Sequence, residues 1–136
     1  MNGLTLRPLA DDVSVFGQVQ PGDITALAAN GFALLVDHRP DHEEPGQPTA
    51  AEMSDACAAA GVDFVHIPVS GLPSPEAVAQ TAEAISAAKG KVLLFCRSGM
   101  RSTVAWARGR RLAGDDAEDL RAAALAAGYD LSSVPL

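Results

Sequence analysis

The segment CRSGMRS, residues 96–102, places one cysteine among two arginines, two serines and a glycine. Cys96 directly follows the short apolar run KVLLF, which is typical of a buried strand, and the residues after the segment favour a helix. Backbone N–H groups at a helix N-terminus can all point at one anion, and their dipoles lower the pKa of a thiol placed there. This arrangement predicts that Cys96 is a nucleophile in an anion-binding loop, with its thiol exposed as a reagent.

The residue types around Cys96 support the same chemistry. Arg97 and Arg101 add positive charge from the same loop, and Gly99 lets the backbone turn tightly around the sulfur. Ser102 is expected to hydrogen-bond the thiolate from the first helical turn. The alternative, a buried structural cysteine before a surface loop, does not account for this combination of neighbours. The candidate catalytic residues are Cys96, Arg101 and Ser102, and the candidate substrate-binding residues of the loop are Arg97, Ser98, Gly99 and Met100.

A second group of polar residues follows the apolar run FALLVD. Parallel strands bring their carboxyl ends to one edge of a sheet, so Asp37 and Arg39 are expected near the Cys96 loop. We assign both as residues that bind the substrate or support those that do, with simple solvation of the loop as the equal alternative. His38 and His42 flank Arg39 in the same stretch.

The other cysteine and His66 favour structural roles. Cys57 recurs with Met53 and Ala60 at helical spacing, which indicates a core position, and a resolving role opposite Cys96 is the minority alternative. His66 alternates with buried positions in a predicted strand. The two cysteines, Cys57 and Cys96, lie far apart in the sequence and form no C-x-x-C pair. We therefore expect neither a metal site nor a cofactor.

The elements that would position these residues alternate between strand and helix. Extended segments are predicted around Leu4–Leu6, Val13–Phe16, Phe32–Asp37, Val62–Val69 and Lys91–Phe95. Helices are predicted over residues 23–30, 49–60, from 74 onward, 102–113 and 117–127. This order predicts an α/β fold with a mainly parallel central sheet flanked by helices on both faces. The Cys96 loop would lie at the carboxyl edge of that sheet.

Length and composition narrow the function classes. The chain has 136 residues, which predicts one domain spanning residues 1–136. Its net charge of −7 argues against nucleic-acid binding through overall charge, although six of its ten Lys and Arg residues fall between Arg97 and Arg121. No apolar run reaches bilayer length, the N-terminus does not resemble a secretory signal, and two cysteines make no disulfide framework. We expect a cytoplasmic protein with a small anionic substrate and no membrane contact; the sequence identifies no protein partner.

The CRSGMRS segment resembles the active-site loops of rhodanese sulfurtransferases and of cysteine phosphatases. The resemblance extends to SVFGQVQPGDITALAANGFALLVDHRPDHEEPGQPT, GVDFVHIPV and FCRSGMRSTVAWA. Over about residues 3–130, these blocks are similar to the beta-lactamase hydrolase-like protein, phosphatase-like domain family, whose members are described both as phosphatases and as sulfur transferases. The resemblance implies a dual-specificity-phosphatase-like fold, Cys96 as the nucleophile and Arg101 as the residue that binds the oxyanion.

The chain departs from the phosphatase pattern at three places. Four residues separate Cys96 from Arg101, whereas tyrosine and dual-specificity phosphatases have five. The shorter loop has the length of a rhodanese loop, which holds a persulfide. Ser70 stands where cysteine phosphatases carry a general-acid Asp, and Phe95 stands where a histidine often precedes the cysteine.

These departures favour sulfur transfer slightly over phosphoester hydrolysis as the reaction of Cys96. In sulfur transfer, Cys96 takes a sulfane sulfur from an anionic donor and becomes a persulfide. In hydrolysis, Cys96 becomes a phosphocysteine, and the poor leaving group needs a proton from a general acid. A third interpretation is a non-catalytic module that binds anions or phosphoproteins with the same pocket.

Overall fold

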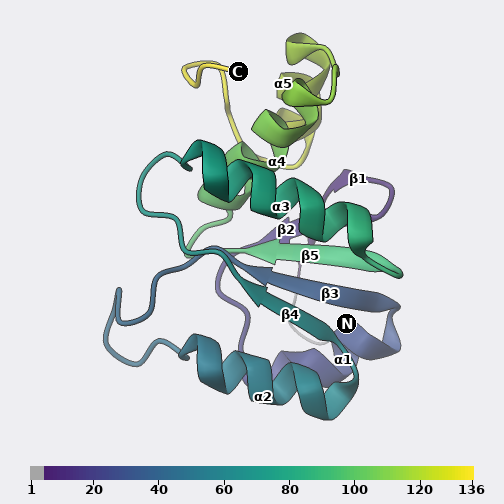
Figure 1. Ribbon diagram of the computed structural model, residues 1–136, viewed down its shortest axis with the longest axis vertical. Helices are drawn as coiled ribbons and strands as arrows, with labels where there is room; N and C mark the ends of the chain where they lie inside the picture. The colour runs from purple at the N-terminus through teal and green to yellow at the C-terminus, as the bar shows by residue number, and fades with distance from the viewer. Residues whose placement is uncertain (1–4) are drawn as a thin grey trace.

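The computed structural model describes residues 5–136, which form a five-stranded sheet with the strand order β1-β2-β5-β3-β4 (Figure 1). β1 pairs antiparallel with β2, and the other neighbours pair in parallel. The strands are β1 (Arg7–Ala10), β2 (Val13–Phe16), β3 (Phe32–Asp37), β4 (Asp63–His66) and β5 (Lys91–Phe95). The mainly parallel sheet of an α/β fold is therefore confirmed.

Helices cover both faces of this sheet. Figure 1 shows α1 and α2 on one face and α3 and α4 on the other, with α5 beyond α4. The helices are the 3₁₀ turn η1 (Pro21–Asp23), α1 (Ile24–Ala29), α2 (Ala50–Ala60), α3 (Pro75–Ala87), α4 (Met100–Leu112) and α5 (Ala117–Ala126). No helix within residues 5–136 is both long enough and apolar enough to span a bilayer.

Local sequence explains where several helices begin and end. Thr49 and Glu52 form a capping box at the start of α2, because each side chain accepts a hydrogen bond from the other residue's backbone N–H. Gly61 ends that helix with φ 75°, a left-handed conformation that glycine adopts without steric cost. Ser74 caps α3 by accepting a hydrogen bond from Ala77 N–H.

Two apolar clusters stabilise the layers. The cluster on the α1 and α2 side includes Leu35, Met53, Cys57, Leu93 and Phe95. The cluster on the other side is built from β-strand residues, α3, α4, α5 and the segment after α5, including Val36, Leu94, Val104, Trp106 and Tyr129. The sheet is therefore buried on both faces, and its carboxyl edge is left to form a site.

Three boundaries differ from the prediction. The first strand is Arg7–Ala10 rather than Leu4–Leu6, of which Leu4 lies outside the described residues. β4 ends at His66, although the N–H groups of Ile67 and Val69 still donate to the carbonyl oxygens of Asp37 and His38. α4 begins at Met100, two residues earlier than expected, so that Arg101 lies in its first turn.

Candidate active site

The loop that follows β5 turns tightly around a sulfur atom. The backbone N–H of Gly99 donates a hydrogen bond to Cys96 Sγ at 3.1 Å, and Gly99 has φ 98°. The turn after β2 packs against the same loop, because a Cβ at Gly17 would lie 2.9 Å from the carbonyl oxygen of Arg97. The predicted loop geometry, with a backbone N–H facing the cysteine at the start of a helix, is present.

The two cysteines are both unpaired and buried. Cys96 has 0% exposure, so the expectation of an exposed thiol is wrong for this state of the molecule, and a reagent must displace a neighbour to reach the sulfur. Cys57 also has 0% exposure and packs with Met53, as its spacing indicates. Burial raises the pKa of the Cys57 thiol to about 11, which keeps it protonated and unreactive.

Arg101 is held by two groups outside its own loop. Its Nη1 and Nη2 groups donate to the two carboxylate oxygens of Glu43, each at 2.8 Å, and Nη1 also donates to the carbonyl oxygen of Val69 at 2.7 Å. The hydrogen bonds to Glu43 raise the pKa of Arg101 against the effect of burial, and the nearby Cys96 sulfur contributes in the same direction. A guanidinium has five N–H donors, so Nε–H and one Nη2–H are left to bind an anion.

Glu43 is in turn held by a buried arginine. Arg39 is 2% exposed; its Nε donates to Glu43 Oε1 at 2.7 Å, its Nη1 donates to Gln18 Oε1 at 2.9 Å, and its Nη2 bonds Glu44. The hydrogen bond from Arg101, followed by that from Arg39, lowers the pKa of Glu43 to about 2 against a smaller effect of burial. Arg39 therefore reaches the site through Glu43 and positions Arg101 indirectly.

Asp37 supports the turn that carries Arg39. Its Oδ1 accepts the backbone N–H of Arg39 at 2.8 Å, and its side chain is buried with 3% exposure. Burial raises the pKa of Asp37 to about 6. Asp37 pairs in register with Phe95, the residue before Cys96.

The hydroxyl of Ser102 bonds to a histidine and not to the sulfur of Cys96. Thr81 Oγ1 donates to Ala77 O at 2.8 Å, so it accepts from His38 Nε2–H, also at 2.8 Å. His38 Nδ1 is then unprotonated and accepts the Ser102 hydroxyl at 2.7 Å. Burial lowers the pKa of His38 to about 4, so this buried ring is neutral near neutral pH. The prediction that Ser102 hydrogen-bonds the Cys96 sulfur is therefore wrong, because its hydroxyl donates to His38 instead.

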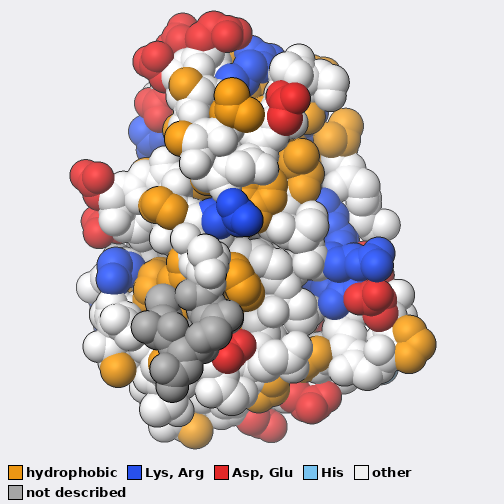
Figure 2. Space-filling view, turned by 180° about the vertical axis from the view of Figure 1, so that it is seen from behind, with side chains coloured by type: hydrophobic (Ala, Val, Ile, Leu, Met, Phe, Trp, Pro, Cys, Tyr) orange, Lys and Arg blue, Asp and Glu red, His pale blue; other side chains and the backbone are white. Residues whose placement is uncertain are grey.

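The remaining loop residues differ in their surroundings. Arg97 has 64% side-chain exposure and lies 3.2 Å from Glu44, and the N–H of Met100 donates to Ser98 Oγ at 3.3 Å. The positive field predicted around Cys96 is therefore balanced in part by two glutamates. Figure 2 shows a group of Lys and Arg side chains at the right edge of the face in view, with Asp or Glu side chains directly beside it.

Sequence reasoning does not single out Glu43, Glu44 or Tyr129, which contact the Cys96 loop or its arginines. Glu43 lies in the HRPDHEEP stretch, where an acidic pair directly beyond the predicted strand end could have indicated partners for arginines. Tyr129 donates its hydroxyl to the carbonyl oxygen of Ser98 at 2.8 Å, and nothing in the tail sequence predicts that contact. His66, expected to be structural, donates from Nε2 to the carbonyl oxygen of Arg39 at 2.8 Å.

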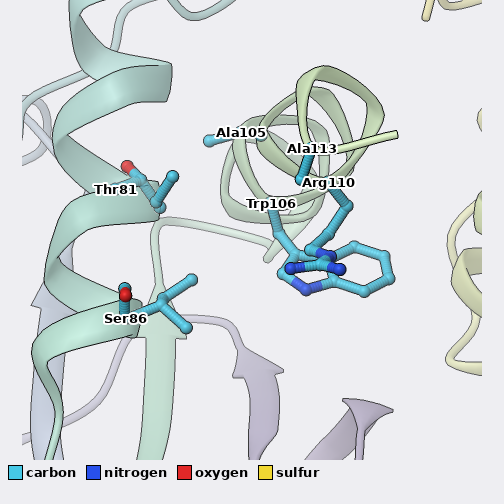
Figure 3. Close-up of a pocket in the computed structure, with 9 residues that line it drawn as sticks. Thr81, Ser86, Ala105, Trp106, Arg110 and Ala113 are labelled. Carbon is cyan, nitrogen blue, oxygen red and sulfur yellow. The ribbon is translucent and has the colours of Figure 1, made fainter. Parts of the chain in front are cut away.

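A separate pocket lies between α3 and α4. It has a volume of about 340 Å³ and is lined by small and polar side chains together with Trp106, as Figure 3 shows for Thr81, Ser86 and Arg110. None of its lining residues belongs to the Cys96–Arg101 loop. Chemistry at Cys96 is therefore not located in this pocket.

A cysteine at the carboxyl end of a central parallel strand, followed by a tight loop and a helix with an arginine in its first turn, defines a phosphatase-like domain of the cysteine type. A sequence profile of the beta-lactamase hydrolase-like protein, phosphatase-like domain family matches residues 5–113. The chain belongs to this family, and the predicted membership is confirmed.

Two curated relatives are beta-lactamase hydrolase-like proteins. The protein of Agrobacterium fabrum is 36% identical over 103 residues, covering 75% of this chain and 24% of the relative. The protein of Xylella fastidiosa is 31% identical over 121 residues, covering 88% of this chain and 28% of the relative. The chain therefore spans about a quarter of the length of the curated relatives it matches.

Solved structures agree with the dual-specificity-phosphatase-like fold. A candidate phosphatase from Neisseria meningitidis has a TM-score of 0.83 and 29% identity, covering 93% of this chain and 91% of its own. The kinase associated phosphatase has a TM-score of 0.67 at 15% identity, covering 87% and 79% of the two chains, and shows the fold alone. These similarities support a phosphatase-like enzyme, and they favour hydrolysis over sulfur transfer.

Proposed function

We propose that this domain is a thiol enzyme in which the Cys96 thiolate attacks a small anionic substrate, and that the substrate is a sulfane-sulfur donor. The observation that supports this choice is the compactness of the loop. Only Arg97, Ser98 and Gly99 lie between Cys96 and the first residue of α4, and Gly99 N–H already faces the sulfur at 3.1 Å. A short ring of amides suits one sulfur atom better than a tetrahedral phosphoryl group.

In this reaction Cys96 would be the nucleophile, and Gly99 and Arg101 would stabilise the negative charges. With thiosulfate as the donor, Cys96 Sγ attacks the sulfane sulfur, and the bond between the two donor sulfurs breaks. Sulfite leaves with the bonding electron pair, and Cys96 carries a persulfide anion. Gly99 N–H stabilises negative charge on the cysteine sulfur, while the free Nε–H and Nη2–H of Arg101 bind the sulfonate oxygens.

Carboxyl groups near the loop support the same choice. Glu43 is ionised and bound to two arginines, with a pKa of about 2, so it does not hold a proton for a leaving group near neutral pH. Ser70, at the position expected for a general acid, is exposed and has no acidic function. Sulfite leaves as a stable anion and needs no such proton, whereas an alkoxide or phenoxide does.

Phosphomonoester hydrolysis is the second candidate, and the structural neighbours named above favour it. Here Cys96 Sγ attacks phosphorus, the ester oxygen leaves with its electron pair, and water later hydrolyses the phosphocysteine. The buried Asp37 has a pKa of about 6 and pairs in register with Phe95, so it is the carboxyl group that we would test first as a proton donor. Hydrolysis without a dedicated acid would be slow and confined to activated aryl phosphates.

The experiment measures both activities on one preparation. Thiosulfate:cyanide sulfur transfer is compared with hydrolysis of phosphotyrosine peptides, using Cys96→Ser as the blank and Cys57→Ser as the matched cysteine control. We expect sulfur transfer that disappears in Cys96→Ser and persists in Cys57→Ser. Efficient phosphotyrosine turnover without sulfur transfer would reverse the ranking, and equal activity in Cys96→Ser would refute the proposal.

A further inference from the structure

The peptide group between Ser98 and Gly99 is held from both sides. Its N–H, contributed by Gly99, donates to Cys96 Sγ at 3.1 Å, and its C=O, contributed by Ser98, accepts the Tyr129 hydroxyl at 2.8 Å. In a trans peptide these two groups point in opposite directions, so fixing the carbonyl also fixes the N–H. By holding the Ser98 carbonyl, the Tyr129 hydroxyl therefore keeps the Gly99 N–H oriented toward the Cys96 sulfur.

The next peptide group along the chain, which begins with the Gly99 carbonyl, is fixed within α4, but this does not fix the orientation of the Ser98–Gly99 peptide. The carbonyl of Gly99 accepts both the N–H and the hydroxyl of Thr103, at 2.9 Å and 2.8 Å. Glycine adopts φ values of either sign, so rotation at Gly99 remains open to the preceding peptide. A flip of that peptide would point the Ser98 carbonyl oxygen toward the sulfur and would disfavour both a thiolate and a bound anion.

Tyr129 also fills the space beside the glycine. A Cβ built on Gly99 would lie 2.1 Å from the Tyr129 hydroxyl oxygen, so the phenol occupies the volume that a side chain would need. The ring is 8% exposed and packs in the core, with the Arg7 guanidinium 5.9 Å from its centroid. Burial raises the pKa of Tyr129, so the hydroxyl keeps its proton and remains a donor.

We propose that Tyr129 is a positioning residue that locks the Ser98–Gly99 peptide in the orientation that stabilises the Cys96 thiolate. The proposal rests on the proposed role of Cys96 as the nucleophile. Tyr129 lies beyond α5 and outside residues 5–113, the part of the chain that matches the family profile. The functional site of this protein therefore extends into a segment that the family match does not cover.

The test uses Tyr129→Phe, which removes only the hydroxyl and keeps the packed ring. The first readout is the rate of Cys96 alkylation by iodoacetamide against pH, and the second is hydrogen exchange of the Gly99 amide by NMR. Ser74→Ala is the matched control, because it removes a hydroxyl hydrogen bond at the start of α3 and does not touch the loop. Thermal unfolding is followed for all three proteins.

We expect Tyr129→Phe to shift the alkylation profile to higher pH, with roughly 3- to 10-fold slower labelling on the acidic limb. Exchange of the Gly99 amide should accelerate by a similar factor, while Ser74→Ala changes the unfolding temperature alone. Superimposable profiles and exchange rates for Tyr129→Phe and the wild type would overturn the proposal. If the wild type transfers no sulfur but Gly99 exchange still depends on Tyr129, the proposed function fails and the peptide lock stands.

Discussion

Arg101 and Glu43 form a bidentate ion pair across 58 residues of sequence, with both N···O distances at 2.8 Å. Glu43 accepts hydrogen bonds from Nη1 and Nη2 of Arg101, so the Nε–H of Arg101 makes no hydrogen bond to this carboxylate. The residue that would bind the substrate anion is therefore oriented by a group from a different loop, which is itself anchored by the buried Arg39.

Replacing Glu43 by Gln should lower sulfur transfer by about tenfold, because an amide cannot accept both N–H groups of Arg101 and loses the charge assistance. Steady-state kinetics measures the effect, which should appear in kcat/KM. Glu118→Gln is the matched control, since the exposed Glu118 pairs with Arg121 at 2.9 Å on α5. Faster turnover in Glu43→Gln would instead identify Glu43 as a competitor of the substrate.

Arg101→Lys should reduce turnover on the order of a hundredfold, because an ammonium cannot present the planar fork of a guanidinium to an oxyanion. The fold should persist, since Arg101 packs at the edge of the sheet and leaves both apolar clusters intact. Circular dichroism and turnover are measured on the same sample. Near-normal activity would show that Arg101 does not bind the substrate anion and would make Arg97 the candidate for that role.

Gly99→Ala should destabilise the domain and abolish activity. The substitution places a Cβ 2.1 Å from the Tyr129 hydroxyl oxygen, in addition to straining a residue with φ 98°. Gly46→Ala separates the two effects, because Gly46 has φ 80° and no atom within 4 Å of the added Cβ. Gly99→Ala should cost about 1–3 kcal/mol more than Gly46→Ala in chemical denaturation. Equal costs would contradict the tight packing of Tyr129 on the loop.

Asp37→Asn should stabilise the domain at pH 7 and lose that advantage in acid. The pKa of Asp37 is raised from 3.8 to about 6 by burial, so its folded-state contribution is most favourable below about pH 4 and is lost as the pH rises through 6. The amide keeps an oxygen for the N–H of Arg39 and carries no charge to desolvate. The gain at pH 7 is on the order of 2 kcal/mol and should fade by pH 4.

The free energy of unfolding of Asp37→Asn should be compared with that of the wild type at each pH, because His38 changes the stability of both proteins with pH in the opposite direction to Asp37. Burial lowers the pKa of His38 from 6.5 to about 4, so stability from its neutral form is lost as the pH falls through that range. Urea unfolding at pH 7 and pH 4 gives the Asp37 difference directly. An Asn variant that is less stable than the wild type at pH 7 would show that the charged carboxylate is net favourable.

The sequence predicts the framework because its signals are local. The apolar run Phe32–Asp37, the Thr49–Glu52 capping box and the glycine-containing turn after Cys96 each depend on neighbouring residues. A run such as Lys91–Phe95 is apolar because both faces of that strand are covered.

The contacts that complete the site join distant segments, which explains why sequence patterns do not predict them. Tyr129 reaches Ser98 from the end of the chain, and its contact depends on how α5 packs. Ser102 lies in the first turn of α4, close to Cys96 in sequence, yet its hydroxyl bonds to His38, which directly follows β3. Such partners are decided by packing, and each candidate role has to be taken from the three-dimensional arrangement.

The most direct test of Cys96 as a sulfur acceptor is mass spectrometry after incubation with thiosulfate, followed by peptide mapping under conditions that preserve persulfides. We predict one added sulfur atom, located on Cys96, which is removed by cyanide and is missing in Cys96→Ser. Cys57, whose thiol has a pKa of about 11, should remain unmodified in the folded protein. An unmodified Cys96, or sulfur on Cys57 instead, would contradict the account.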